Sequence, residues 1–236
     1  MYNGSDGHQR YRCFGCGAGH DVIDFIAAIE GVDPVKAVEI LTNRQMPDIG
    51  KIERKPPPPD QSSVWKPIVP APDDAPDYDP ARTFNPKRGD YVPYRPARLD
   101  SYYSADNRVL CHVVRLEFAD GAKACLTITW CSGPGDVFAW AARRMEPPFP
   151  LMNLNGLASR PNDCVLIVSG EKCQSEATER MKNFVIVTWL GGDGAVAHVD
   201  VTPLRGRYIT YWPDADSSSK RSMIEMHNRI ERHGTG

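Results

Sequence analysis

The sequence has 236 residues, of which 41% are hydrophobic and 25% are charged, and its formal net charge at pH 7 is −2. These values predict one large or two small folded domains and argue against global disorder. No apolar stretch approaches the roughly 18 to 20 residues of a membrane helix, and the polar N-terminus lacks the apolar core of a secretion signal. No overall basic field is present, so any nucleic-acid binding must come from local sites. Seven scattered cysteines favour a reducing, cytoplasmic location over a disulfide framework.

The N-terminal residues 1–47 combine a Cys-x-x-Cys pair with two helix patterns. Cys13 and Cys16 are spaced to supply two thiolates to a tetrahedral zinc site. From this pair alone, free thiols or a redox pair are equally open interpretations, although a redox motif is expected at a helix start inside a βαβ fold. Apolar residues at helical spacing predict a helix over residues 22–29, and a proline in the first turn favours a second helix over residues 34–41.

Proline dominates the middle of the sequence. Most of its 21 prolines crowd into residues 48–100, including four in succession at 56–59. Because proline lacks an amide hydrogen and fixes φ, such a stretch is a poor candidate for a helix interior or a central strand. We therefore expect residues 48–100 to be an extended linker between a short N-terminal unit and a longer C-terminal one.

The remainder of the sequence begins as β structure and then alternates strands with helices. Two segments of alternating apolar and polar residues, 109–118 and 124–130, flank a turn and predict a β-hairpin within a β-rich region, 101–160. The region 161–236 then predicts a parallel sheet with crossover helices, because fully apolar strands recur between helix patterns. The expected strands are 164–168, 184–187 and 208–212, and the expected helices are 174–181, 195–199 and 217–232.

Acidic residues follow the first and the third of these buried strands. Glu171 comes just after the first strand, and Asp214 and Asp216 come just after the third. Because the carboxyl ends of parallel strands lie along one edge of a sheet, where ligands bind, we expect the three acids to converge. A few carboxylates with substrate phosphates suit Mg²⁺ (or Mn²⁺). The alternative for the segment 214–217 is a cap on the last helix.

A glycine-rich loop follows the second strand on the same predicted edge. Gly191, Gly192 and Gly194 would let backbone amides approach a phosphate, and the start of the next helix would favour its negative charge. Lys172 and Lys220 would neutralise further charge. The sequence therefore predicts a nucleotide phosphate site beside the metal site.

Three segments carry a resemblance to a known family. Residues 168–172 (Val-Ser-Gly-Glu-Lys), 187–192 (Val-Thr-Trp-Leu-Gly-Gly) and 212–216 (Trp-Pro-Asp-Ala-Asp) resemble the motifs of a Toprim domain. They are most similar to the version in DNA primases of phages and mobile elements, which is often joined to a helicase. The likeness covers roughly Tyr102 to the C-terminus, and it implies an α/β fold with a Toprim-like, mainly parallel sheet and flanking helices over 161–236.

The resemblance also implies roles for individual residues. In the family, the glutamate that matches Glu171 acts as a general acid or base, and the aspartates that match Asp214 and Asp216 bind Mg²⁺. We accordingly place Glu171 and Lys172 at the catalytic centre. Single-stranded DNA and nucleoside triphosphates are the implied partners, together with a replicative helicase, and no membrane is implied.

The N-terminal cysteine pair carries a second, independent resemblance. Residues 11–19 (Tyr-Arg-Cys-Phe-Gly-Cys-Gly-Ala-Gly), with the Asp-Val-Ile-Asp-Phe segment at residues 21–25, are similar to the second half of the zinc-binding domain of bacterial replicative primases. This implies Zn²⁺ on Cys13 and Cys16. The family's first ligand pair would precede Met1, and its Toprim sheet continues with another strand and helix, so we expect a zinc-ribbon remnant in a trimmed relative.

Several other reactive or aromatic residues are expected to be structural. Cys111 and His112 are neighbours on a predicted strand, so they point to opposite faces and cannot form a nucleophile–base pair. The tryptophans of the C-terminal region are expected to pack in the core rather than stack on bases. They are Trp130, Trp140, Trp189 and Trp212.

These patterns together predict a DNA primase that makes RNA primers on single-stranded DNA by Mg²⁺-dependent nucleotidyl transfer, in phage or mobile-element replication. Two alternatives use the same residues. One is a Toprim nuclease, which would cut DNA without nucleoside triphosphates. The other is a non-catalytic nucleic-acid-binding or regulatory remnant of a primase.

Overall fold

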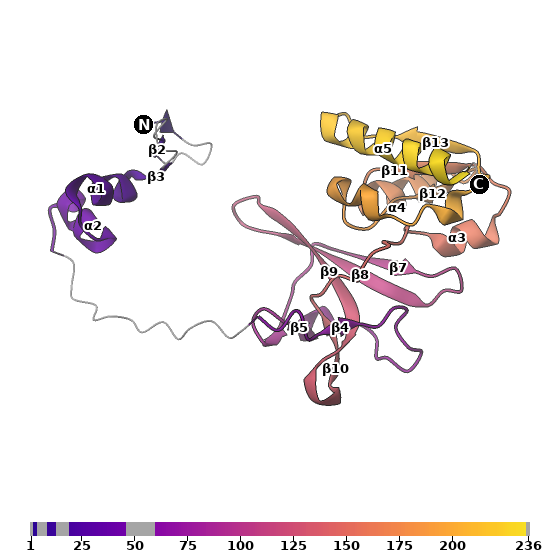
Figure 1. Cartoon of the computed structure of the whole chain (residues 1–236), viewed down its shortest axis with the longest axis horizontal. Helices are drawn as coiled ribbons and strands as arrows, with labels where there is room; N and C mark the ends of the chain where they lie inside the picture. The colour runs from indigo at the N-terminus through magenta and orange to yellow at the C-terminus, as the bar shows by residue number, and fades with distance from the viewer. Residues whose placement is uncertain (1, 4–8, 13–18, 46–59, 235–236) are drawn as a thin grey trace. The chain divides into compact units, whose positions relative to one another are not determined.

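The computed structural model describes residues 2–3, 9–12, 19–45 and 60–234, and it divides the chain into two compact units, Met1–Pro56 and Pro57–Gly236. Figure 1 shows the elements of each unit along the chain. In the described parts of the sequence, none of the helices has the length and apolar character needed to cross a membrane.

The first unit pairs a small antiparallel sheet with two helices. Both helices form where the apolar spacing predicts them, and each begins at an aspartate whose carboxylate accepts two backbone amides, Asp21 in one case and Asp33 in the other. Such caps satisfy amides that the first helical turn leaves without a partner. The elements are β1 (Tyr2–Asn3), β2 (Gln9–Arg12), β3 (Gly19–Asp21), α1 (Val22–Glu30) and α2 (Pro34–Thr42).

The second unit begins with a seven-stranded sheet. Six strands follow the order β6-β5-β10-β9-β8-β7, and β4 is the seventh, paired with β9. The predicted hairpin forms its centre, because β8 and β9 pair antiparallel. The strands are β4 (Lys66–Pro67), β5 (Thr83–Asn85), β6 (Asp90–Val92), β7 (Arg98–Tyr103), β8 (Val109–Glu117), β9 (Lys123–Ser132) and β10 (Phe138–Ala141), and the 3₁₀-helices η1 (Pro80–Arg82) and η2 (Pro134–Asp136) connect some of them.

The expected linker, 48–100, differs from the structure over its second part. From residue 60 onward the chain is folded against the sheet and contains four strands, and Trp65 and Phe84 stack in a buried cluster with ring centroids 4.2 Å apart. The prolines are compatible with this arrangement because the strands around them are only two or three residues long, so few ladder hydrogen bonds are lost.

A three-stranded parallel sheet, in the order β12-β11-β13, follows as the pattern of buried strands predicts. Its residues alternate between two cores. Val165 and Ile167 face one core, and Leu166 and Val168 face the other, so β11 is buried on both sides. The elements here are α3 (Leu154–Ser159), β11 (Val165–Val168), α4 (Glu171–Arg180), β12 (Val185–Val187), η3 (Asp193–His198), η4 (Thr202–Leu204), β13 (Ile209–Trp212) and α5 (Ser217–Gly234).

Helices cover both faces of this parallel sheet, with α5 on one side and α4 on the other (Figure 1). The chain segment that precedes β11 packs on the same side of the sheet as α5, because Leu151 and Leu157 are buried in the same core as that helix. A further buried cluster joins the two sheets of the unit, with Tyr102 from β7 and Leu190 from the loop after β12 among its members. The packing therefore holds β7 beside the parallel sheet.

One buried histidine lies on the far face of β8. Cys111 packs in the cluster between the sheets, whereas His112 stacks on Tyr78, with ring centroids 4.8 Å apart, so the two neighbours do face opposite sides. The Nδ1 atom of His112 is 2.9 Å from Oγ of Ser101. Burial lowers the pKa of His112 from the usual 6.5 to about 4, because the charged imidazolium would lose its hydration there.

We therefore expect His112 to make the fold sensitive to acid. The unfolded histidine takes up a proton near pH 6.5, but the folded one stays neutral until about pH 4. The stability that this difference provides is present above pH 6.5 and is lost as the pH falls toward 4, at a cost of at most about 3 kcal/mol. Urea unfolding of wild type and His112→Phe at pH 7, 5.5 and 4.5 measures this. A variant as acid-sensitive as wild type would contradict the assignment.

Candidate active site at the strand ends

The carboxyl ends of β11 and β13 lie side by side, because Val168 is paired with Trp212 at the last position of both strands. A buried serine of α5 joins the segments that follow them. Oγ of Ser219 is 2.5 Å from Oγ of Ser169, and it accepts the backbone N–H of Asp214 at 2.9 Å. The segment after the first strand is thus tied to the segment after the third.

The loop after the second strand is joined to the same edge. The backbone N–H of Gly170 donates to Oγ1 of Thr188 at 3.0 Å, and Thr188 is only 1% exposed. Gly170 has φ of 84°, in the left-handed region where glycine is favoured, and it directly precedes the first turn of α4. All three predicted motif segments therefore meet at one edge of the parallel sheet.

Glu171 is the first residue of α4, and its carboxylate is held from the neighbouring sheet. The Tyr102 hydroxyl of β7 donates to Oε1 of Glu171 at 2.9 Å. Arg98, on the same strand, donates to Oγ of Ser175 at 2.6 Å and is paired with the buried Asp100. Sequence reasoning missed Tyr102 and Arg98, because they lie some 70 residues before α4 and no local pattern links them to it.

The environment of Glu171 keeps its neighbours protonated. Burial, together with the Glu171 charge, raises the pKa of Tyr102 well above its ordinary value, so the phenol remains a hydrogen-bond donor at neutral pH. The same two causes, burial first, raise the pKa of the Cys111 thiol. This cysteine is therefore an inert core residue and not a nucleophile.

The two aspartates after β13 have different surroundings. Asp214 and Asp216 are both exposed, but Oδ1 of Asp216 accepts the backbone N–H of Ser219 at 2.8 Å. Asp216 thus fills the capping role that the sequence left as an alternative. Ser219 links the two, because its amide contacts Asp216 while its hydroxyl contacts the backbone of Asp214.

The expected cluster of three acids is not formed. Within the parts of the chain that the structure describes, no three His, Cys, Asp or Glu side chains are placed to hold a metal ion. Glu171 is hydrogen-bonded to Tyr102 on the neighbouring sheet. The remaining pair, Asp214 and Asp216, fits Mg²⁺ or Mn²⁺ chemically, because Mg²⁺ is commonly held by one or two carboxylates, several waters and substrate phosphates.

The glycine loop adopts backbone angles that favour glycine. Gly191 and Gly192 have φ of 94° and 67°, and a Cβ on Gly191 would lie 2.8 Å from Cβ of Ala195. The short helix expected near residues 195–199 forms as η3, a six-residue 3₁₀-helix that begins at Asp193. We therefore assign no anion site to a helix terminus here. Gly194 is exposed in η3.

Basic residues surround this edge. Lys172 in α4 and Lys220 in α5 are both exposed, as a role with phosphates requires. Arg144, which the sequence analysis did not single out, lies close to the glycine loop: a Cβ on Gly191 would be 3.3 Å from its Nη1. Its guanidinium carbon lies 4.5 Å from the centre of the Phe149 ring, so the aromatic face holds it in place.

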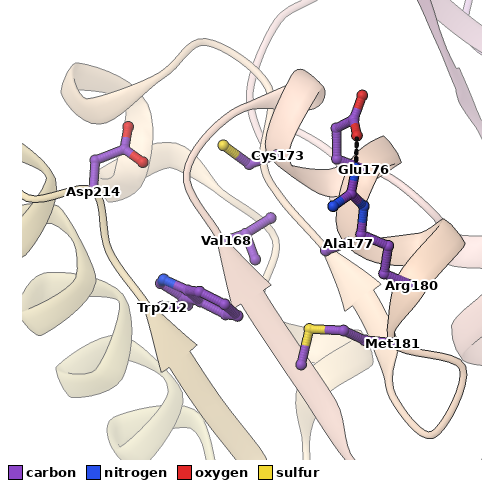
Figure 2. A pocket seen from close by; sticks show the side chains of 8 residues that line it. All are labelled: Val168, Cys173, Glu176, Ala177, Arg180, Met181, Trp212 and Asp214. Carbon is purple, nitrogen blue, oxygen red and sulfur yellow. Dashed lines mark hydrogen bonds and ion pairs between the residues drawn. The ribbon is translucent and has the colours of Figure 1, made fainter.

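A cavity of about 490 Å³ opens beside Asp214, between β11, β13 and α4. Figure 2 shows Asp214 at one end and Trp212 on the strand below it, with the ion-paired Glu176 and Arg180 on the opposite wall. Trp212 is 58% exposed, which corrects its assignment to the core. The alternation of β13 explains this, since Tyr211 packs inward and Trp212 points to the face that α4 covers incompletely.

The zinc prediction cannot be placed on this structure, because Cys13 and Cys16 lie outside the described residues. The described strands β2 and β3 flank them and pair antiparallel, with Arg12 opposite Gly19.

Comparison with known proteins gives one family match. Residues 2–55 match the CHC2 zinc finger family, the zinc ribbon of DnaG. The solved zinc-binding and RNA polymerase domains of the Aquifex aeolicus primase are similar with a TM-score of 0.40 at 14% identity. It covers 96% of this chain and 65% of that one, so this chain spans less than two thirds of its length. No curated protein matches the sequence.

The Tyr102–Glu171 hydrogen bond predicts a measurable loss of stability. We expect Tyr102→Phe to lower the unfolding free energy by about 1–3 kcal/mol, because it removes a buried donor from a charged carboxylate. Tyr103→Phe is the matched control: this neighbour is 38% exposed and points to the other face of β7, so its change should stay within about 0.5 kcal/mol. Urea denaturation at pH 7 measures both. Equal losses in the two variants would contradict the proposed bond.

Proposed function

We propose that this protein is a primase-type nucleotidyltransferase that joins ribonucleotides on a single-stranded DNA template. The match of residues 2–55 to a primase-type zinc finger carries this proposal. The strand-end arrangement around Ser219 supports it, because it brings Asp214 close to the loop that leads into Glu171. The proposed setting is the replication of a phage or mobile element, with a replicative helicase as partner.

Asp214 and Asp216 would hold Mg²⁺ (or Mn²⁺), which when bound neutralises the triphosphate and the charge that develops on it. Asp214 is the freer of the two carboxylates, because Oδ1 of Asp216 is engaged with the start of α5. That bond fixes the orientation of Asp216 and leaves its second oxygen for the metal. Ser219, which holds both segments, is a positioning residue in this scheme.

Glu171 would take the proton from the attacking 3′-hydroxyl. The hydroxyl oxygen then forms a bond to the α-phosphorus, the bond from that phosphorus to the bridging oxygen breaks, and pyrophosphate leaves with the bonding electrons. The Tyr102 hydroxyl contacts one carboxylate oxygen and leaves the other to accept the proton. Because the pKa of Tyr102 is raised, the tyrosine itself does not compete as a base.

Phosphate binding would fall to the basic residues and the glycine loop. Lys172 follows Glu171 directly, and Lys220 follows Ser219, so each lies next to a residue of the proposed centre. The exposed backbone of Gly191, Gly192 and Gly194 lies on the same edge, close to Arg144. These groups would orient the triphosphate and offset its charge.

Trp212 would provide a surface for the base of the nucleotide. Its ring is exposed and lines the cavity that ends at Asp214 (Figure 2). A base stacked there would place its phosphates toward the acidic end of the cavity, and stacking on an aromatic ring tolerates all four bases. The zinc-finger unit, with Zn²⁺ on Cys13 and Cys16, would contact the template.

A second candidate function is a non-catalytic nucleic-acid-binding module. The observation that favours it is the absence of a three-ligand metal group among the described residues, with Glu171 bonded to Tyr102. A nuclease that uses the same acids is a further alternative. The experiment below separates all three functions.

Incorporation of labelled ribonucleotides on single-stranded DNA, with Mg²⁺ or Mn²⁺, tests the proposal. We expect wild type to form primers, and Glu171→Gln and Asp214→Asn each to lower the rate on the order of 10²-fold or more. Glu179→Gln is the matched control, because Glu179 is an exposed acid on the same helix, and its rate should stay within about twofold of wild type.

The outcomes that contradict the proposal are specific. Cleavage of the DNA without any need for triphosphates would identify a nuclease. DNA binding with neither extension nor cleavage would favour the non-catalytic module. Circular dichroism of each variant distinguishes a loss of chemistry from a loss of fold.

A further inference from the structure

A second cavity, of about 310 Å³, lies on the face of the larger sheet that points away from Glu171. The register of β7 shifts between Tyr102 and Tyr103. Tyr102 contacts Glu171, whereas Tyr103 lines this cavity. The segment from Ala71 to Tyr78 crosses the sheet and forms the other wall. The cavity is therefore separate from the strand-end site.

Aromatic rings in fixed positions line this cavity. Tyr78 stacks on His112, and His112 meets Trp140 edge-on with ring centroids 4.9 Å apart. The indole N–H of Trp140 donates to the backbone oxygen of Pro76 at 2.7 Å, which fastens the crossing segment to the sheet. Tyr103 adds a fourth ring at the rim, where it is 38% exposed. A ligand would meet a preformed surface and would need little ordering of these side chains.

One polar atom at this cavity lacks a partner. The His112 ring is only 8% exposed and lines the cavity, and its Nδ1 contacts Ser101. Its Nε2 is buried without a hydrogen bond to any described residue. Buried polar atoms normally find partners, and an unsatisfied one costs free energy that a ligand donor would recover.

The charge around this cavity is acidic. Asp73 and Asp77 line it, and the segment 72–79 contains four aspartates and no lysine or arginine. Arg108 is the one cationic residue among the described residues of the lining, and it lies 3.6 Å from Asp106. Such a site repels phosphates and attracts cations. The combination of aromatic faces with carboxylates favours a guanidinium, which stacks on rings and donates several hydrogen bonds in one plane.

A smaller cavity of about 240 Å³ adjoins the first one. The two share Pro76, Asp77 and Trp140, and the second is lined by Trp130 and by Phe138, which is 50% exposed. Its lining combines aromatic rings with Asp79 and Arg82, and the exposed Phe138 ring offers an apolar contact for an uncharged side chain. Two neighbouring cavities along one strip can receive successive side chains of an extended peptide, as aromatic grooves for extended peptides do.

The linings of these two cavities together form one aromatic–acidic surface. We propose that this surface binds an extended, arginine-bearing segment of a partner protein. The arginine side chain lies in the larger cavity, between the carboxylates of Asp73 and Asp77 and against the aromatic rings. An apolar neighbour of that arginine occupies the smaller cavity beside Phe138. This site does not depend on the chemistry at Glu171, so loss of one leaves the other intact.

Titration of the full, ¹⁵N-labelled chain with the capped peptide acetyl-Pro-Arg-Pro-Leu-amide tests the proposal. The reporter is the indole N–H signal of Trp140, assigned by its loss in Trp140→Phe. We expect a saturable shift of this signal and, for the isosteric citrulline peptide, about tenfold weaker binding, since the charge is lost. The double variant Asp73→Asn with Asp77→Asn should weaken binding of the arginine peptide by about tenfold or more.

Asp74→Asn is the matched control, because Asp74 belongs to the same acidic segment but does not line either cavity. Its effect should stay below about twofold. If Asp74→Asn weakened peptide binding as much as the double variant does, the interaction would be general charge attraction, and the proposed site would be wrong. No shift of Trp140 at millimolar peptide would also overturn it. Displacement of the peptide by a single-stranded oligothymidylate would assign the surface to nucleic acid instead.

Discussion

The candidate site depends on one buried hydroxyl. Ser219 is 2% exposed, and its Oγ contacts the loop after β11 through Ser169 and the loop after β13 through the amide of Asp214. Parallel pairing brings the two strand ends together, but it does not fix the loops that leave them. The serine hydroxyl, placed by the first turn of α5, does so, and the same turn is capped by Asp216. The placement of Asp214 and Asp216 is thus coupled to the start of α5.

The larger sheet contributes side chains to the candidate site. It supplies Tyr102 to Glu171, and it supplies Arg98 to Ser175 in the next turn of α4. Tyr102 belongs to the buried cluster that joins the two sheets, and a hydrogen bond to a charged carboxylate is stronger than one between neutral groups. The orientation of Glu171 is therefore decided by residues of a different sheet. The opposite face of that sheet carries the aromatic–acidic surface, so its two faces have distinct chemistry.

Much of the fold follows from local patterns in the sequence, but the site follows only in part. Fully apolar strands predicted the parallel sheet, because burial on both faces leaves no room for polar residues. The many prolines wrongly predicted an extended linker for residues 60–100, since short strands tolerate proline where long ones do not. Strand order placed Asp214 and Glu171 at one edge, but it could not show that Tyr102 turns Glu171 toward the other sheet. Likewise, the exposure of Trp212 depends on how far α4 extends over β13, which no sequence spacing encodes.

The most direct test of the central claim is the affinity for Mn²⁺, measured by electron paramagnetic resonance with a non-hydrolysable ribonucleoside triphosphate present. If Ser219 positions the metal-holding loop, Ser219→Ala should lower the affinity for Mn²⁺ by about tenfold or more, although no metal ligand is removed. Ser222→Ala is the control, because Ser222 is a buried serine on the same helix. Among the described residues, its hydroxyl donates to the backbone oxygens of Ser218 and Asp193 and not to the segment of Asp214. Equal affinities of wild type and Ser219→Ala, or no Mn²⁺ binding by wild type, would contradict a metal site at these strand ends.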